Sequence, residues 1–305
     1  MHDVIIIGAG PAGYTAGIYC SRARHDTLLI SGILPGGQLM NTTDVENYPG
    51  FSDGIMGPDL MTVMRKQTEK MGTKIIDDEV TSVDFKNRPL KVKTASEEFE
   101  ARAVIVCTGA NPRKIGLEGE QTFAGKGVSY CATCDGAFFR DQELIVVGGG
   151  DSAMEEAIFL TKFASVVHIV HRKEEFRASK IMQERALSNE KIKVHFNFTV
   201  KEIHGDQKFQ QVVLNNTKTN EDKILEAGGL FIAIGHEPNS AIFQDQIELD
   251  RNGYMIIKNN TETSVTGVFC AGDVHDHRYR QAVTAAGFGC MAAIDVDKYL
   301  SESNT

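Results

Sequence analysis

The sequence predicts an α/β protein with two Rossmann-like dinucleotide-binding domains, one of them inserted into the other. A short, continuous apolar run followed by a glycine-rich turn occurs twice, at Val4–Gly13 and at Leu144–Ala153. Such runs are typical of parallel strands that are buried on both faces and lead through a tight turn into a helix. A later strand of each copy also ends similarly, in Gly109-Ala-Asn-Pro112 and in Gly235-His-Glu-Pro238. The chain is therefore predicted to be a pseudo-repeat of two nucleotide-binding units.

The net charge and the short apolar runs of the chain argue against several classes of protein. The 305 residues suffice for about two domains, and a net charge of -9 argues against nucleic-acid binding, which needs a basic surface. No apolar run approaches the length of a membrane span, and Asp3 just before the first short run is unlike a signal peptide. We therefore expect a cytoplasmic protein that binds neither nucleic acid nor membrane.

The first glycine-rich turn, Gly8-Ala-Gly10-Pro-Ala-Gly13, lies between a buried strand and the start of a helix. Its glycines let the backbone approach a pyrophosphate at the helix N-terminus, where free N–H groups and the helix dipole favour an anion. The next strand, Leu28–Ile30, ends in Ser31, with no acidic residue for an adenosine ribose. This departure from the usual NAD pattern favours a flavin dinucleotide, also held by the loop Gly36-Gly37-Gln38.

The second turn, Gly148-Gly-Gly150-Asp-Ser-Ala153, precedes a strand with a different end. Val166–Val170 is followed by His171-Arg172-Lys173, and Arg177 lies further on. Cations in place of the acidic residue are what the 2′-phosphate of NADPH requires, although a solvated basic helix start is the alternative. The second domain is therefore predicted to bind NADPH.

Cys131 and Cys134 form a C-x-x-C motif just before the second turn, a pattern that fits a redox pair or half of a zinc site. Structural zinc needs four ligands, and the remaining cysteines stand singly in the chain. We therefore predict a redox-active disulfide and no metal site. Asp135 is a candidate general acid for a leaving thiolate if burial raises its pKa; an ordinary turn aspartate is the alternative.

A third strand, Val268–Ala271, ends in Gly272-Asp273 without a fingerprint of its own. A helix rich in small residues follows at about Gln281–Tyr299, and such residues allow close packing against a sheet or a cofactor. The chain is therefore expected to return to its first domain. The predicted domains are 1–112 and 244–305 for the FAD domain, and 113–243 for the inserted NADPH domain with the dithiol.

Over essentially its whole length the chain resembles the low-molecular-weight thioredoxin reductases, FAD- and NADPH-dependent pyridine nucleotide-disulfide oxidoreductases. The strings that carry the resemblance are Gly8-Ala-Gly-Pro-Ala-Gly13-Tyr-Thr-Ala16, Gly36-Gly-Gln-Leu39, Val45-Glu-Asn-Tyr-Pro-Gly50, Cys131-Ala-Thr-Cys-Asp-Gly136, Gly148-Gly-Gly150, His171-Arg172, Gly272-Asp273-Val274 and Tyr279-Arg-Gln-Ala282. The position of the cysteine pair is specific, because glutathione reductase-like enzymes keep theirs near the N-terminal flavin loop.

The resemblance implies a homodimeric enzyme that transfers electrons from NADPH through FAD and the Cys131–Cys134 disulfide to thioredoxin. Cys134 would face the flavin, Asp135 would protonate a thiolate, and Cys131 would attack thioredoxin. The dithiol and the NADPH turn lie on one domain and must both reach one flavin. We therefore expect the inserted domain to rotate between two positions.

The resemblance also predicts the cofactor-binding residues. In the first domain these are Gly8, Gly10, Ala12, Gly13, Ser31, Gly37, Gln38, Asn47, Val80, Thr108, Gly109, Gly272, Asp273, Arg280, Gln281 and Ala282. In the inserted domain they are Gly149, Gly150, Asp151, Ser152, Glu155, His171, Arg172, Lys173, Arg177, Ile234 and Gly235. Asp273 would hold the ribityl chain. The family usually has arginine where Lys173 stands, and lysine keeps the charge but lacks the planar fork.

Other readings of the same residues stay open. A related dithiol flavoprotein would take electrons from ferredoxin or pass them to a peroxiredoxin-type protein. The cationic strand end argues against the first of these, and the lack of an extra N-terminal redox domain argues against the second. Ferredoxin–NADP reductase-like enzymes lack the C-x-x-C, and a flavin-binding sensor would not depend on its thiols.

Overall fold

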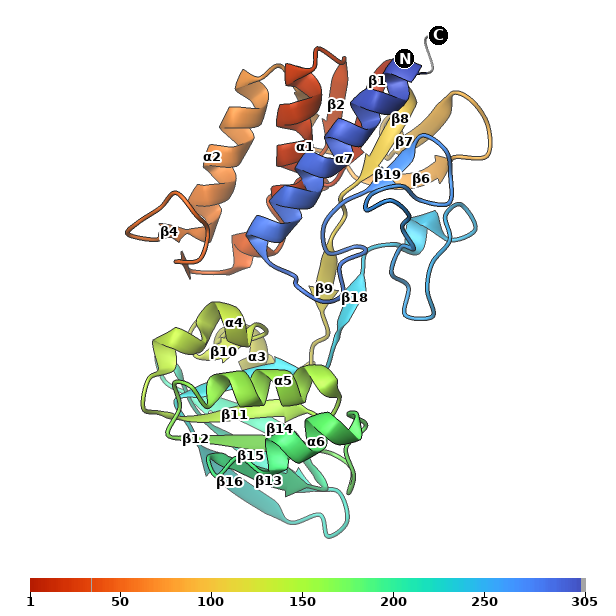
Figure 1. The fold of residues 1–305 in the computed structure, drawn as a ribbon. Helices are drawn as coiled ribbons and strands as arrows, with labels where there is room; N and C mark the ends of the chain where they lie inside the picture. The colour runs from red at the N-terminus through yellow and green to blue at the C-terminus, as the bar shows by residue number, and fades with distance from the viewer. Residues whose placement is uncertain (34, 303–305) are drawn as a thin grey trace. The chain divides into compact units, whose positions relative to one another are not determined.

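The computed structural model describes residues 1–33 and 35–302, and the chain divides into two units (Figure 1). Unit 1 consists of Met1–Asn111 and the segment from Glu237 onward, and unit 2 consists of Pro112–His236. The second predicted boundary, after residue 243, differs from the observed one, after His236. The reason is that Phe243 is fully buried in a hydrophobic cluster of unit 1.

Unit 1 is built on a seven-stranded sheet of order β5-β2-β1-β8-β7-β6, with β19 also paired to β8. Its strands are β1 (His2–Ile7), β2 (Thr27–Ile30), β5 (Lys74–Ile76), β6 (Val80–Asp84), β7 (Leu90–Thr94), β8 (Glu98–Val106) and β19 (Val268–Cys270). The strands β5, β2, β1, β8 and β19 run parallel, β7 pairs antiparallel with β8, and β6 pairs antiparallel with β7. Because the central strands are buried on both faces, their sequences are continuous apolar runs rather than alternating ones.

The two faces of this sheet support separate hydrophobic clusters. Side chains alternate along a strand, so Val4 and Ile6 belong to one cluster and Ile5 and Ile7 to the other. Three helices cover the first face: α1 (Pro11–Arg22), α2 (Gly57–Lys70) and α7 (Ala282–Glu302) (Figure 1). The short elements of unit 1 are η1 (Gly37–Asn41), β3 (Asp44–Val45), β4 (Ile55–Met56) and η3 (Ala241–Phe243).

Helix α7 packs closely against helix α1, whereas its small residues were expected to pack against a sheet or a cofactor. A Cβ atom added to Gly289 would stand 2.1 Å from the carbonyl oxygen of Ala12. Ala285, Ala286 and Ala292 are also buried along this helix. No helix within residues 1–33 and 35–302 is both long enough and apolar enough to cross a membrane.

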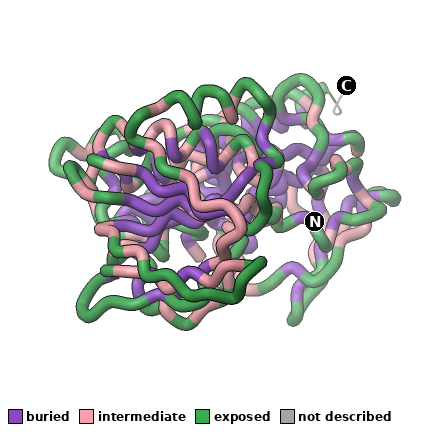
Figure 2. Tube along the Cα trace, turned by 90° about the horizontal axis from the view of Figure 1, so that it is seen from below, coloured by how far each residue is buried: buried purple, intermediate pink, exposed green. Residues whose placement is uncertain are grey.

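Unit 2 contains a five-stranded parallel sheet of order β10-β17-β11-β12-β13. Its strands are β10 (Val128–Ser129), β11 (Glu143–Gly148), β12 (Val166–His171), β13 (Ile192–Phe196) and β17 (Gly229–Ala233). The helical elements are α3 (Glu118–Thr122), α4 (Ala132–Asp135), η2 (Gly136–Phe139), α5 (Asp151–Leu160) and α6 (Lys180–Leu187). The buried segments in Figure 2 include parallel runs of strand, with exposed loops around them.

A three-stranded antiparallel sheet shares a second hydrophobic cluster with the parallel sheet of unit 2. It consists of β14 (Phe198–Gly205), β15 (Phe209–Asn216) and β16 (Asp222–Glu226). The apolar residues of α5 and α6 belong to the other cluster of this unit, so the antiparallel sheet covers the face that these helices leave open. This sheet was not foreseen from the sequence.

A chain of polar side chains connects four strands of unit 2. His168 lies between Glu143, 2.8 Å away, and His195, 2.9 Å away, and the Lys223 ammonium is 3.4 Å from the other nitrogen of His195. Because lysine can only donate and an ionised carboxylate can only accept, the bonds run from Lys223 to His195, from His195 to His168 and from His168 to Glu143. Burial, together with the nearby Lys223, lowers the pKa of His195 to about 4.

The chain passes between the units twice, through β9 (Ala110–Pro112) and β18 (His236–Pro238). These two strands pair with each other. Flanking backbone bonds extend the ribbon, from Arg113 N–H to the Gly235 carbonyl and from Asn239 N–H to the Gly109 carbonyl, each 2.9 Å. The two similar strand endings noted in the sequence are therefore hydrogen-bonded to one another.

Gly289→Ala is expected to destabilise the protein by about 1–3 kcal/mol, because the new methyl group meets backbone that cannot rotate away. Gly287→Ala is the matched control on the same helix, since its Cβ would have no atom within 4 Å. Thermal unfolding followed by circular dichroism measures both. Equal midpoints for the two variants would contradict the proposed close approach of α7 to α1.

Candidate active site

Cys131 and Cys134 form a disulfide at the start of α4 in unit 2, with their Cα atoms 5.3 Å apart. Cys134 is exposed and Cys131 is half-buried. The backbone N–H of Cys134 donates to the Cys131 sulfur at 3.2 Å. In the described part of the chain, the other cysteines are free and no cluster of His, Cys, Asp or Glu could hold a metal ion. The motif therefore has the geometry of a dithiol/disulfide pair.

Asp135 follows the disulfide and is partly buried. Burial raises the pKa of this carboxyl group, and a hydrogen bond from the Ser129 hydroxyl, 2.6 Å from Oδ2, opposes the rise. The same hydroxyl oxygen accepts from the Cys131 N–H at 3.0 Å. Ser129 thus joins the acid to the cysteine loop, and the sequence analysis missed it. The available signal was a hydroxyl residue at the end of a strand, two positions before the first cysteine.

In unit 1 the turn from β1 into α1 leaves no room for side chains at two of its glycines. A Cβ on Gly13 would stand 1.9 Å from the Gly8 carbonyl oxygen, and one on Gly8 would stand 2.3 Å from the Cys107 carbonyl oxygen. Gly10, which precedes the first turn of α1, differs because an added Cβ would meet nothing within 4 Å. The free N–H groups of that turn can therefore be approached by a phosphate.

The parallel strands of unit 1 end at one edge of the sheet, which brings most of the predicted residues together. Gly8 follows β1, Ser31 follows β2, Thr108 and Gly109 follow β8, and Gly272 follows β19. Contacts join other predicted residues to this edge or to one another. A Cβ on Gly37 would lie 3.6 Å from Gly10 Cα, one on Gly272 would lie 3.1 Å from Ala12 Cβ, and Asn47 donates to Gln281 at 3.3 Å.

Two predicted residues of unit 1 have other partners. The Gln38 amide donates to Asn111 at 2.7 Å. Val80 begins β6, and its side chain belongs to the hydrophobic cluster that contains Phe243. The structure therefore shows Val80 as a core residue rather than as part of the strand-end group.

Asp273, just after β19, has a buried carboxylate oxygen, Oδ1, for which no hydrogen-bond partner is found among the described residues. Burial and the nearby Asp276 raise the pKa of Asp273 to about 7, although Arg280 opposes the rise. Arg280 and Ala282 lie where the chain enters α7, and Arg280 N–H donates to Asp276 at 3.2 Å. An unpartnered oxygen at this edge fits a hydroxyl-rich ligand.

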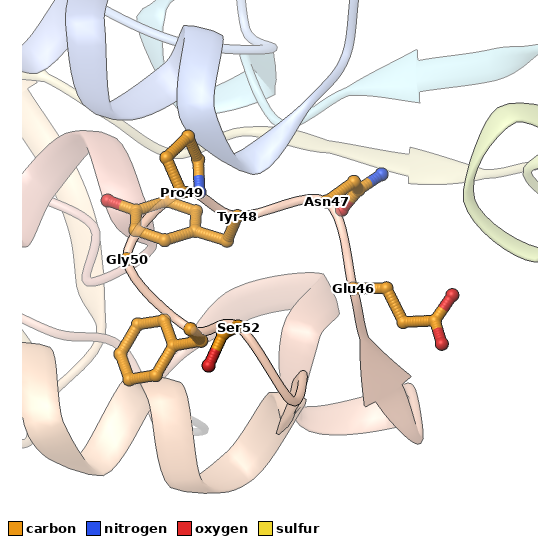
Figure 3. A pocket seen from close by; sticks show the side chains of 7 residues that line it. Glu46, Asn47, Tyr48, Pro49, Gly50 and Ser52 are labelled. Atoms are coloured by element: carbon orange, nitrogen blue, oxygen red, sulfur yellow. The ribbon is translucent and has the colours of Figure 1, made fainter.

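An open hollow of about 560 Å³ lies beside β3 and β4 and is lined by residues 46–52 (Figure 3). Glu46 and Asn47 point to the same side of this loop, and Tyr48 extends along Pro49. Asn47 is the residue of this loop that also bonds Gln281 at the start of α7. The loop therefore connects the hollow to the strand-end group.

The turn from β11 into α5 repeats this construction in unit 2. A Cβ on Gly148 would stand 2.4 Å from the Ala233 carbonyl oxygen, and one on Gly149 would stand 2.2 Å from the His171 ring. Gly150, like Gly10, precedes its helix and has nothing within 4 Å of an added Cβ. The first turn of α5 is therefore equally accessible to a phosphate.

Two residues predicted to touch the nucleotide make contacts within the protein. His171 is buried, its Nε2 donates to the Glu175 carbonyl at 3.0 Å, and the ring also bonds the backbone of Gly148. Burial lowers the pKa of His171. Asp151 accepts from the N–H and the hydroxyl of Ser179, both at 2.8 Å. His171 and Asp151 thus fix the loop after β12, and their contact with the nucleotide stays a prediction.

The cations of that loop are exposed, in contrast. Arg172, Lys173 and Arg177 have no acidic partner among the side chains that the structure describes. The remaining predicted residues, Ser152 and Glu155 on α5 and Ile234 and Gly235 after β17, lie on elements adjacent to this turn in unit 2. An unneutralised group of cations beside an accessible helix start fits a phosphorylated nucleotide.

Comparison with known proteins shows the family of the chain. Residues 2–289 match the family model described as pyridine nucleotide-disulphide oxidoreductase. A thioredoxin reductase of Streptomyces clavuligerus is 53% identical over 307 residues, covering 99% of this chain and 94% of that protein. The chain belongs to this family, and within it to the thioredoxin reductases.

Further relatives agree with this thioredoxin reductase assignment. The thioredoxin reductase of Mycolicibacterium smegmatis is 52% identical and covers 100% of this chain and 98% of its own. The solved thioredoxin reductase of Giardia duodenalis superposes with a TM-score of 0.95 at 42% identity, covering 98% of this chain and 99% of that one. The predicted fold class and family are confirmed. FAD and NADPH are the cofactors of this family.

The residues of this chain fit both cofactors. For FAD, the fit rests on the unpartnered Asp273 oxygen and the accessible helix start at Gly10. For NADPH, it rests on the accessible helix start at Gly150 and the unpaired cations after β12.

Ser129→Ala is expected to raise the pKa of Asp135, because the lost hydroxyl bond stabilises the carboxylate while burial continues to favour the neutral acid. Titration of carbon-13-labelled aspartate by NMR measures the change. Ser129→Thr keeps the hydroxyl and serves as the control with an unshifted midpoint. A lowered pKa in the alanine variant would show that Ser129 is not the group that stabilises the charge.

Proposed function

We propose that this protein is an NADPH-dependent thioredoxin-disulfide reductase of the cytoplasm that acts as a homodimer. The observation that carries the proposal is the Cys131–Cys134 disulfide in the same unit as a nucleotide turn flanked by unpaired cations. The named relatives are thioredoxin reductases, which supports thioredoxin as the acceptor.

Unit 1 would hold FAD and unit 2 would hold NADPH. The start of α1 at Gly10 would bind the FAD pyrophosphate, and Asp273 would bond a ribityl hydroxyl through its unpartnered oxygen. The start of α5 at Gly150 would bind the NADPH pyrophosphate, with Arg172 and Arg177 on the 2′-phosphate. When bound, FAD supplies the redox chemistry that links a hydride donor to a disulfide acceptor.

The disulfide chemistry belongs to three residues of unit 2. The Cys131–Cys134 bond accepts two electrons and opens, and Asp135 gives a proton to one sulfur; its raised pKa keeps that proton available. The N–H of Cys134 stabilises a thiolate on Cys131, which attacks one sulfur of the thioredoxin disulfide and displaces the other. Cys134 then returns its proton to Asp135 and attacks the mixed disulfide as a thiolate, which releases reduced thioredoxin and restores the bond to Cys131.

The dithiol and the NADPH turn both belong to unit 2, whereas the proposed FAD residues belong to unit 1. We therefore include in the proposal that unit 2 rotates about the paired strands β9 and β18, so that each reaches the flavin in turn. A covalent tether that locks one position and leaves turnover intact would contradict the rotation.

Anaerobic mixing of the purified protein with NADPH is expected to bleach the visible flavin band rapidly, whereas NADH acts much more slowly. The physical reason is the charge of Arg172, Lys173 and Arg177, which favours a 2′-phosphate over a hydroxyl. Stopped-flow absorbance measures both rates. A protein that contains flavin but is bleached by neither nucleotide would favour the ferredoxin-dependent alternative.

Cys131→Ser is expected to abolish thioredoxin reduction by at least about a hundredfold while flavin reduction by NADPH persists, since the nucleophile is lost and the hydride path is intact. Cys134→Ser is the matched variant, and it should accumulate a mixed disulfide with thioredoxin that Cys131→Ser cannot form. Non-reducing electrophoresis and mass spectrometry detect the adduct. If Cys131→Ser formed the adduct instead, Cys134 would be the cysteine that attacks thioredoxin and Cys131 the one that resolves the mixed disulfide.

The homodimer is supported by an apolar stripe on α7. Val283, Met291 and Ile294 are exposed at helical spacing, and Tyr19 on the adjacent α1 is exposed as well. Ile294→Glu is expected to convert the protein into a monomer, because each copy of a two-fold interface would bury the new charge. Sedimentation velocity measures the mass, with Ile224→Glu in unit 2 as an exposed control. Wild-type protein that sediments as a monomer would contradict the dimer.

A further inference from the structure

The hairpin between β15 and β16 carries a lysine on a well-defined turn. The Asn216 side-chain oxygen accepts from the N–H groups of Lys218 and Thr219, at 2.9 and 3.1 Å. The Asn220 N–H returns to the Asn216 carbonyl at 2.8 Å, and Asn220 has a left-handed φ of 59°. The backbone of Lys218 is therefore fixed, although its side chain is exposed.

Hydrogen bonds attach this hairpin tip to the loop that follows β12. The Thr217 N–H donates to the Asn197 carbonyl at 2.7 Å, and the Thr217 hydroxyl reaches the Arg172 carbonyl at 3.4 Å. In turn, the Asn197 N–H donates to the Lys173 carbonyl at 3.1 Å. The tip is thus bonded directly to Arg172 and, through Asn197, to Lys173.

Lys173 and Lys218 line the same hollow, about 430 Å³ in volume, together with Glu174, Glu175 and Asn197. The Lys218 ammonium pairs with Glu174. Both side chains are more than half exposed, at 58% and 68%, so this ion pair contributes little free energy. A phosphate monoester carries more negative charge than a carboxylate and can take over the ammonium group.

We infer that Lys218 is a further residue of the 2′-phosphate site and contributes to the preference for NADPH over NADH. The inference rests on the proposed use of NADPH. The loop offers Lys173, a compact charge without the planar fork of arginine, and Lys218 adds a second ammonium from a different element. Glu174 competes with the 2′-phosphate for Lys218: it pairs with the Lys218 ammonium when no nucleotide is bound. When Lys218 is removed, the carboxylate of Glu174 repels the 2′-phosphate.

Calorimetric titration of the oxidised, FAD-containing enzyme with 2′,5′-ADP and with 5′-ADP tests the inference without turnover. Lys218→Ala is expected to weaken binding of 2′,5′-ADP by about three- to tenfold, the range of one exposed charge-assisted bond, and to leave 5′-ADP unchanged. Lys201→Ala is the matched control, because Lys201 pairs with Asp222 at 2.6 Å in the same three-stranded sheet. This control should bind both probes like the wild type.

A second variant separates direct contact from an effect through the carboxylate. Glu174→Gln should bind 2′,5′-ADP more tightly than the wild type, and adding Lys218→Ala to it should again weaken binding. The inference would be overturned if Lys218→Ala bound 2′,5′-ADP as tightly as Lys201→Ala does. It would also be overturned if adding Lys218→Ala to Glu174→Gln did not weaken the binding of 2′,5′-ADP. Wild-type enzyme that binds 2′,5′-ADP no more tightly than 5′-ADP would refute NADPH as the donor, independently of Lys218. Arg172→Ala on the same titration tests the proposed contact of Arg172 with the 2′-phosphate.

Discussion

Close approach between backbone segments is the constraint on which both nucleotide-binding units depend. At Gly13, Gly148 and Gly289 an added Cβ would stand between 1.9 and 2.4 Å from a carbonyl oxygen, closer than any atom can come. Because these positions lack side chains, α1 and α5 can begin directly at the ends of buried strands, and α7 can lie on α1. The accessible first turns of α1 and α5 follow from this packing, because both helices begin beside the ends of the buried strands.

Burial raises the pKa of two carboxyl groups, one in each unit, to which the proposed mechanism gives different roles. Asp135 and Asp273 are both partly buried, and this burial raises the pKa of each. Asp135 is held by the Ser129 hydroxyl, which fixes it beside the cysteine loop. Asp273 keeps one oxygen without a partner among the described residues. The same physical effect therefore acts on the proposed proton donor of unit 2 and on the proposed ribityl-binding group of unit 1.

Local patterns predicted most of the fold, because buried parallel strands and glycine turns are written in consecutive residues. The end of the inserted unit depends on where Phe243 is buried, and no local signal gives that. The roles of side chains were harder to predict. His171 stands at the expected strand end, yet its ring is used inside the protein. Ser129 lies only two positions before the first cysteine, so a local signal was available and was missed. Lys218 reaches the loop after β12 through tertiary contacts, which spacing in the sequence does not reveal.

The polar chain from Glu143 through His168 and His195 to Lys223 sets an acid limit on unit 2. The pKa of His195 falls from its ordinary 6.5 to about 4 in the folded protein, so the unfolded chain binds a proton more readily. The stability that this histidine contributes is complete above pH 6.5 and is lost as the pH falls toward 4. Thermal unfolding of the wild type and of His195→Gln at pH 7 and pH 5 would measure this loss, because only the wild type should lose stability through this group.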